Sequence, residues 1–367
     1  MSSPVFWTPQ TFFYPLGNTP AVSLTRDLPP EQPADILLLG CGDPRHILYT
    51  CYADVTPSLE PRKIDVTCCD LEPAVLARNI LLFTLTEANT PVDVIWDIFY
   101  HFKIDSQALN TLVSQSELLH GYSQDMETWR QSPYGSFLAF LEPRTLSEIR
   151  RYWRSYADFR NLSHSRTDEL RRQHTELYEN LRKGFTNNLN ASRSAGLSWL
   201  EAIPSMNNLF LRYWKNGTTS SDVKQAVNFN PSFIYSSLGE SFSPHGATFP
   251  GDFHLAPAYV PITSDPTQPS SPGTKQSPVE ISKQQFQAWC NAFKVHRDAS
   301  AIVVRSYAGD ALSFCRALDL STLPVPQTSG IFNTHWRAAR IHLEQDLFNT
   351  PNSFDVIDTS NLADYLG

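Results

Sequence analysis

Hydrophobic and polar positions divide the chain into two α/β segments separated by a long stretch of different character. Residues 36–39 are a continuous apolar run that ends at Gly40, which is typical of a strand covered on both faces. Residues 64–70 predict a second strand. A short helix is expected over residues 47–52, and a longer one begins at Pro73, where apolar residues recur at helical spacing. Alternating strands and helices predict a parallel sheet.

The middle of the chain has another pattern. From about residue 92 to residue 213, apolar residues recur at helical spacing in several segments, which predicts amphipathic helices. Aromatic stripes on these helices, such as Trp96, Phe99 and Tyr100, are typical of core packing or of a helix–helix seam. Residues 216–281 are rich in proline, serine, glycine and asparagine, and they predict a surface loop.

The α/β pattern returns near Ala301. A β-branched run that closes on Gly309 and Asp310 predicts a third strand followed by a short helix, and residues 354–358 predict a fourth strand. Because the two α/β segments complement each other, we expect one Rossmann-like parallel sheet that is interrupted by a large α-helical insertion.

This interpretation divides the chain into four parts. They are an aromatic, proline-rich N-terminal arm (1–34), the first half of the sheet (35–90), the helical insertion with its loop (91–299), and the second half of the sheet (300–367). A sheet of this kind normally has about three more strands, and an unpaired edge is a liability. The missing strands would come from elsewhere in the chain, from a partner, or from a longer protein of which this chain is a fragment, and we favour the fragment.

Composition excludes several classes of function. The formal net charge of −8 argues against sequence-blind binding to nucleic acid or to anionic membranes. An arginine-rich segment at residues 150–160 is compatible with RNA binding, but its interspersed acidic residues favour a solvated helix face or a protein contact. No apolar run reaches the length of a membrane span, and the N-terminus does not read as a signal peptide. We therefore expect a cytoplasmic protein.

The cysteines indicate free thiols in a reducing compartment. None of the six forms a C-x-x-C pair, so no zinc site is predicted and no metal is expected. Cys68 and Cys69 alternate across a strand, which is typical of filler on the two faces of a sheet.

Candidate ligand-binding residues gather where the predicted strands end, which is where open parallel sheets bind ligands. Gly40 and Gly42 allow a tight turn and a close backbone approach. Asp70 ends the second strand, where a carboxylate can accept from both hydroxyls of a ribose, and Asp310 ends the third, where it can meet an adenine amino group. The full set is Gly40, Cys41, Gly42, Asp43, Asp70, Leu71, Asp310, Ala311, Asp358 and Ser360.

Each candidate also has a structural interpretation. The two glycines can form a simple strand-to-helix connection, and Asp70 and Asp310 can cap the helices that follow them. His46, close to the turn, can be a general base, or it can be a surface or capping group.

The motifs ILLLGCGD, VTCCDLEP, GDAL and FDVIDTSN resemble the sheet of class I S-adenosylmethionine-dependent methyltransferases. More closely, the two α/β segments resemble a domain of unknown function in fungal proteins. That domain often stands ahead of a MYND-type zinc finger, and a related domain forms the N-terminal part of a dynein axonemal assembly factor. The resemblance covers the α/β segments well and the insertion loosely. It implies a methyltransferase-like fold with S-adenosylmethionine as candidate cofactor.

Three departures from the methyltransferase pattern bear on activity. Leu38 stands where the turn usually has an acidic residue, and Pro44 replaces its third small residue. The fourth strand is followed by DTSN rather than by an N-P-P-Y or D-P-P-Y motif. We therefore expect a non-catalytic or weakly ligand-binding assembly-factor module that holds protein partners through its insertion. The alternative is a methyltransferase of unknown acceptor that binds S-adenosylmethionine at Gly40, Gly42, Asp70 and Asp310.

Overall fold

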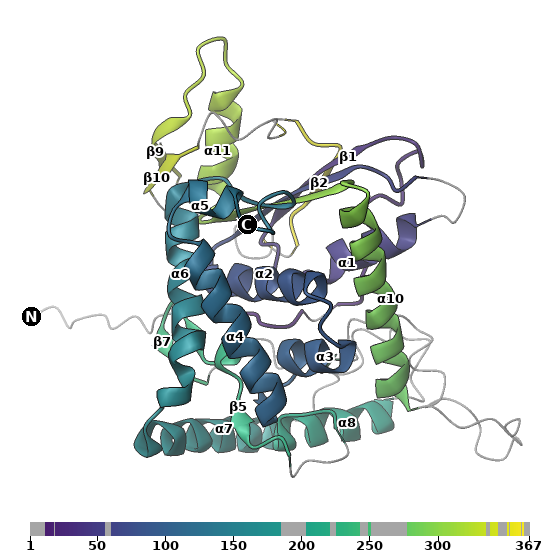
Figure 1. Ribbon diagram of the computed structural model, residues 1–367, viewed down its shortest axis with the longest axis vertical. Helices are drawn as coiled ribbons and strands as arrows, with labels where there is room; N and C mark the ends of the chain where they lie inside the picture. Colours follow the sequence, from purple (N-terminus) through teal and green to yellow (C-terminus); the bar gives the residue numbers. More distant parts are fainter. Residues whose placement is uncertain are drawn as a thin grey trace, which may run out of the picture.

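A five-stranded parallel sheet lies at the centre of the fold, in the strand order β11–β1–β2–β8–β4 (Figure 1). Its strands are β1 (Ala34–Leu39), β2 (Ile64–Asp70), β4 (Leu138–Phe140), β8 (Ile302–Ala308) and β11 (Val356–Asp358). The computed structural model describes residues 12–17, 19–55, 60–184, 203–220, 225–242, 249–250, 277–334, 338–343, 351, 353–360 and 362. Parts of the predicted arm, loop and C-terminal half lie outside these residues.

The two α/β segments form one sheet, so the predicted mixed α/β fold with a parallel sheet is confirmed. Strand β2 pairs with β1 on one side and with β8 on the other, from Ile64 opposite Ile302 to Asp70 opposite Ala308. The predicted limits of β2 match the structure, whereas β11 begins two residues later than predicted, at Val356.

The predicted α-helical insertion also contains one strand of the five-stranded sheet. Residues Leu138–Phe140 form β4, which lies parallel to β8 at the edge of the sheet, with Leu138 opposite Val304 and Phe140 opposite Ser306. A three-residue strand between helices is too short to show a period of two, so the sequence pattern does not predict it. The insertion thus supplies one strand of the sheet. The limits of the four predicted parts remain a prediction.

The helices of the described chain pack mostly on one face of the sheet. Ile36 and Leu38 of β1 face the larger core, which includes residues of α1, α2 and α10, and Leu37 and Leu39 face the smaller core beneath α11. The helices are α1 (Arg45–Asp54), α2 (Pro73–Glu87), α3 (Val92–Tyr100), α4 (Ser106–Tyr122), α5 (Met126–Arg130), α6 (Pro143–Ala157), α7 (His164–Gly184), α8 (Ile203–Asn216), α10 (Pro278–Asp298) and α11 (Ala311–Ser321). None of them combines the length and the hydrophobicity needed to span a membrane.

Short elements complete the described fold. The predicted loop at 216–281 contains the strands β5 (Asn228–Phe229), β6 (Tyr235–Ser236) and β7 (Gly239–Glu240), and α10 starts within it behind a capping box of Ser277 and Glu280. The strands β9 (Ser329–Asn333) and β10 (Ala338–His342), which were not predicted, form a hairpin beside α11. Figure 1 shows this hairpin at the opposite end of the molecule from α7 and α8.

A buried arginine joins the arm to the helical part of the chain. Arg78 of α2 is 2% exposed, and its guanidinium lies over the rings of Phe99 and Phe233, 4.9 and 4.2 Å from their centroids. It donates to the carbonyl oxygens of Phe99 (2.6 Å), Ser232 (3.0 Å) and Pro15 (3.4 Å). Burial lowers its pKa to about 10, so it stays charged near neutral pH. Three segments far apart in the sequence thus meet at one side chain.

We expect Arg78→Lys to lower the free energy of unfolding by about 3 kcal/mol, because an ammonium cannot reproduce the fork of donors that the three carbonyl groups accept from. Urea unfolding of the full chain measures this change. The control is Arg316→Lys on the exposed face of α11, where a change within about 0.5 kcal/mol is expected. Equal stability of the two variants would contradict the role given to Arg78.

Candidate functional site

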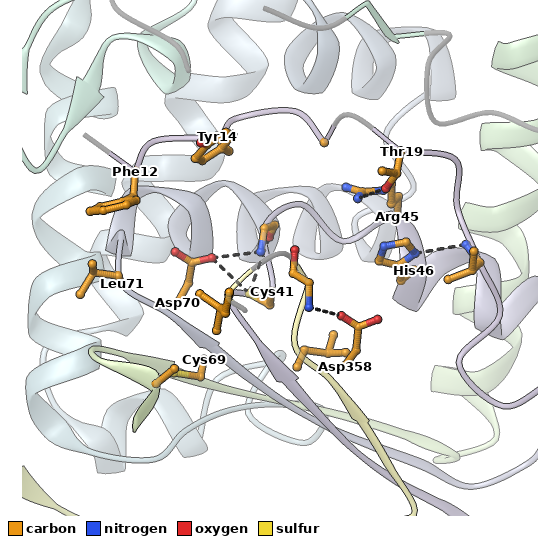
Figure 2. A pocket seen from close by; sticks show the side chains of 18 of the residues that line it. Phe12, Tyr14, Thr19, Cys41, Arg45, His46, Cys69, Asp70, Leu71 and Asp358 are labelled. Atoms are coloured by element: carbon orange, nitrogen blue, oxygen red, sulfur yellow. Dashed lines mark hydrogen bonds between the residues drawn. The ribbon is translucent and has the colours of Figure 1, made fainter. Parts of the chain in front are cut away.

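A cavity of about 590 Å³ lies at the carboxyl ends of β1, β2, β8 and β11 (Figure 2). Parallel strands present these ends at one edge, and so the strand-end residues of both α/β segments meet there. Nine of the ten predicted ligand-binding residues line the cavity: Gly40, Cys41, Gly42, Asp70, Leu71, Asp310, Ala311, Asp358 and Ser360. Asp43 does not.

The glycine turn after β1 is held against β2. Gly40 and Gly42 have φ angles of +66° and +56°, in the left-handed region that favours glycine. The N–H of Gly40 donates to Cys69 O (2.8 Å), and the N–H of Gly42 donates to Asp70 Oδ2 (3.0 Å). A Cβ built on Gly42 would meet nothing within 4 Å. The turn is therefore a tight connection between strand and helix, and it also presents an open face to the cavity. The structural and the ligand-binding interpretations of these glycines are compatible.

Asp70 is a buried carboxylate at the floor of the cavity, 7% exposed. Its Oδ1 accepts from the N–H of Glu72 (2.9 Å), and its Oδ2 accepts from Gly42 and from the thiol of Cys41 (3.8 Å). Burial raises the pKa of Asp70 to about 6 although these hydrogen bonds lower it. Glu72, and not Asp70, is the N-cap of α2, since it accepts from the N–H of Ala74. The capping interpretation of Asp70 is therefore wrong.

Two further carboxylates lie at the ends of β8 and β11. Asp310 is the N-cap of α11, where its Oδ1 accepts from the N–H of Ser313 (2.8 Å), and it also lines the cavity. Asp358 accepts from the N–H of Ser360 (2.7 Å) through its Oδ1. In both side chains Oδ2 has no hydrogen-bond partner within the described part of the chain. Each carboxylate thus combines a local structural bond with an oxygen available to a ligand.

Asp43 holds the N-terminal arm instead of lining the cavity. It is 3% exposed, accepts from the N–H of Gly17, and forms an ion pair with Arg45 Nη1 (2.9 Å). Arg45 Nη2 in turn donates to the hydroxyl of Thr19 (2.8 Å). Asp43 was predicted to bind the ligand, but in the structure it does not line the cavity. Its oxygens accept from the arm and from Arg45 instead.

The N-terminal arm runs alongside α1 and covers the cavity as its roof. The sequence did not indicate this position of the arm. His46 Nδ1 accepts from the N–H of Val22 (3.1 Å), and the hydroxyl of Thr50 accepts from the N–H of Leu24 (2.9 Å). Burial and the neighbouring Arg45 lower the pKa of His46 to about 4, so it is neutral near pH 7. The arm residues that line the cavity are Phe12, Tyr14, Gly17, Thr19, Pro20 and Val22.

The electrostatic character of the cavity is acidic. Three carboxylates line it, those of Asp70, Asp310 and Asp358. Among the described lining residues the arginine is Arg45, and its charge is already paired with Asp43. This balance favours neutral or cationic ligand groups over phosphates.

The thiols in the wall of the cavity are poor nucleophiles. Burial raises the pKa of Cys69, and a hydrogen bond with Cys68 together with burial raises that of Cys41. Among the described residues, no group of three or more His, Cys, Asp or Glu side chains is arranged to hold a metal ion.

The raised pKa of Asp70 makes stability depend on pH. Between its ordinary value of 3.8 and about 6, the folded protein binds the proton more tightly than the unfolded chain does. Asp70 therefore destabilises the fold increasingly as pH rises from about 4 to about 6, by roughly 3 kcal/mol in all. The unfolding free energy of the wild type minus that of Asp70→Asn should fall by this amount over that range. Urea unfolding at several pH values measures it.

The matched control for this pH series is Asp319→Asn, at an exposed position of α11. It removes one exposed carboxylate away from the cavity, so it reports what the loss of a negative charge does without the burial of Asp70. Parallel pH curves for the wild type and Asp70→Asn would show that burial does not raise the pKa of Asp70.

The Asp43 contacts predict local protection of the arm. In Asp43→Ala, hydrogen exchange in peptides covering residues 12–22 should become roughly ten-fold faster, because the N–H of Gly17 loses its acceptor and Arg45 is no longer held. Peptides covering residues 64–70 of β2 provide the internal control and should not change. Mass spectrometry of the full chain measures exchange in both sets of peptides. Unaltered exchange in the arm would show that the contacts of Asp43 do not hold the arm.

Comparison with known proteins identifies one family model, described as a domain of unknown function (DUF4470), which matches residues 15–104. The matched range includes most of the described arm, β1, the glycine turn, β2 and α2, and thus Gly40, Gly42 and Asp70. Asp310 and Asp358 lie outside it. No curated protein and no solved structure matches the chain.

Proposed function

We propose that this chain is a methyltransferase-like module that binds S-adenosylmethionine or its demethylated product, and that it works as a scaffold for protein partners. The cavity at the strand ends carries this proposal, because it unites nine residues that were singled out for ligand binding from the sequence. The supporting arguments concern the sheet order, the charge of the cavity and the turn after β1.

The strand order supports a Rossmann-like sheet. Numbered along the chain, the four strands of the two α/β segments are β1, β2, β8 and β11, and they lie in the spatial order 3-2-1-4. In doubly wound sheets of this order the ligand crevice opens where the order reverses, beside the first strand. The glycine turn follows that strand, and the acidic residue that would bind a ribose ends the next one.

The chemistry of the lining fits a nucleoside that carries positive charge. Asp70 can accept from ribose hydroxyls, and Asp310 can accept from an adenine amino group through its Oδ2. S-adenosylmethionine adds a sulfonium and an ammonium group, which an acidic cavity favours, whereas a dinucleotide would bring phosphates to the same carboxylates. When bound, S-adenosylmethionine supplies an activated methyl group.

The scaffold part of the proposal rests on the departures from the methyltransferase pattern. Leu38 replaces the acidic residue of the turn, Pro44 lacks an N–H, and DTSN follows β11. The resemblance to fungal domains that precede MYND-type zinc fingers, and to a dynein axonemal assembly factor, supports a role in holding protein partners. We assign that role to the helical insertion and place the protein in the cytoplasm.

Calorimetric titration with S-adenosylmethionine and S-adenosylhomocysteine tests the ligand. The wild type should bind both. Asp70→Asn should bind about ten-fold more weakly, because a charge-assisted hydrogen bond to the ribose is lost. Ala311→Trp should abolish binding by filling the cavity. The control Asp319→Asn should bind like the wild type.

The absence of binding to folded wild-type protein would overturn the proposal. Binding that Asp70→Asn and Ala311→Trp leave unchanged would place the ligand elsewhere on the molecule.

Methyl transfer is the second candidate function, and the position of Asp358 in the cavity favours it, because a carboxylate there can accept a hydrogen bond from the methyl acceptor. His46 also lines the cavity, but it is a weak base, since burial lowers its pKa to about 4 and its Nδ1 accepts from the N–H of Val22. Production of S-adenosylhomocysteine in the presence of cell extract, lost in Ala311→Trp, would establish an enzyme. Binding without production would argue against methyl transfer to any acceptor in the extract.

A further inference from the structure

The N-terminal arm contributes two aromatic rings to one end of the cavity. Phe12 and Tyr14 line the same cavity as Asp70 and Leu71. Figure 2 shows the two rings near Asp70 and Leu71, whereas Arg45 lies toward the other end. The two aromatic rings thus lie in the same part of the site as Asp70, the carboxylate that is proposed to bind the ribose.

The structure fixes the backbone between these two rings and after them. Phe13, between them, is 1% exposed and packs with Ala74 and Val75 at the start of α2. Pro15 O accepts from Arg78, and the N–H of Gly17 donates to Asp43. Because these anchors lie between and after the two rings, the fold holds Phe12 and Tyr14 in place. The aromatic wall that the two rings form is therefore preorganised for a ligand.

We propose that Phe12 and Tyr14 form the base-binding wall of an adenine-nucleoside subsite, with Leu71 as its apolar counterpart at the end of β2. This inference rests on the proposed function and adds the part of the ligand that the arm recognises. A flat aromatic ring stacks favourably on aromatic side chains, and stacking is worth most where water is excluded.

The neighbouring groups select the class of ring. Asp70 stands beside the aromatic wall, so a ring bound there has a sugar-binding carboxylate next to it. Asp310, also in the lining, is an acceptor that suits the amino group of adenine and repels the carbonyl oxygen that guanine has at the equivalent position. The subsite therefore fits adenosine derivatives, and the arm, which lies outside the sheet, determines how tightly the base is held.

Titrations of variants with S-adenosylhomocysteine, 5′-methylthioadenosine and methionine test this assignment. Phe12→Leu and Tyr14→Leu should each weaken binding of the two adenosine derivatives roughly ten-fold, about 1.4 kcal/mol, with no change in the affinity for methionine. Tyr14→Phe keeps the ring and should bind like the wild type. Ser23→Ala is the control for a general loosening of the arm, because the Ser23 hydroxyl bonds to that of Thr25 (3.2 Å) and does not line the cavity. It should also bind like the wild type.

The outcomes separate this inference from the proposed function. If the wild type binds the adenosine derivatives and the two leucine variants bind them equally well, the base-binding wall is wrong and the proposed function stands. If the leucine variants also exchange faster in peptides covering residues 12–22, the rings hold the arm instead of the base, and the assignment is again wrong. If the wild type binds no adenosine derivative, the proposed function fails and the inference fails with it.

Discussion

The pairing of β2 with β8 is the interaction on which the rest of the structure depends. It joins two strands about 240 residues apart along seven consecutive pairs, and a partly buried ion pair between Asp65 and Arg305 links the same two strands. At its carboxyl end, the N–H of Gly309 donates to Asp70 O (2.8 Å). This bond brings the end of the third predicted strand beside the end of the second, so Asp70 and Asp310 share one cavity only because this pairing forms.

Residues that line the cavity also hold the local structure around it. Asp310 caps α11 and also lines the cavity, and its Oδ2 has no hydrogen-bond partner among the described residues. Gly42 closes a tight turn while its face stays open. Asp70 is different, because its buried charge costs stability at neutral pH. A carboxylate kept ionised at such a cost is typical of a binding site and unusual in a purely structural turn.

The arm changes the strand ends from an open crevice into a roofed site. Its hydrogen bonds run from Asp43 and Arg45 at the start of α1 to Thr50 two turns later, so one helix both follows the glycine turn and holds the roof. Asp43 therefore serves the site indirectly. A substitution there would change the position of the arm over the cavity without removing any atom that lines the cavity.

The sequence by itself determined the local elements and the chemistry at their ends. Strand β2, the start of α2 at Pro73 and the strand-end carboxylates could be predicted, because apolar runs, proline at a helix start and polar strand ends are patterns within a few neighbouring residues. Only the tertiary structure decided that β4 joins the sheet, that Asp43 binds the arm, and that Phe12 and Tyr14 line the cavity. These features depend on contacts between distant segments, and a proline-broken arm or a three-residue strand has no periodicity from which such contacts could be inferred.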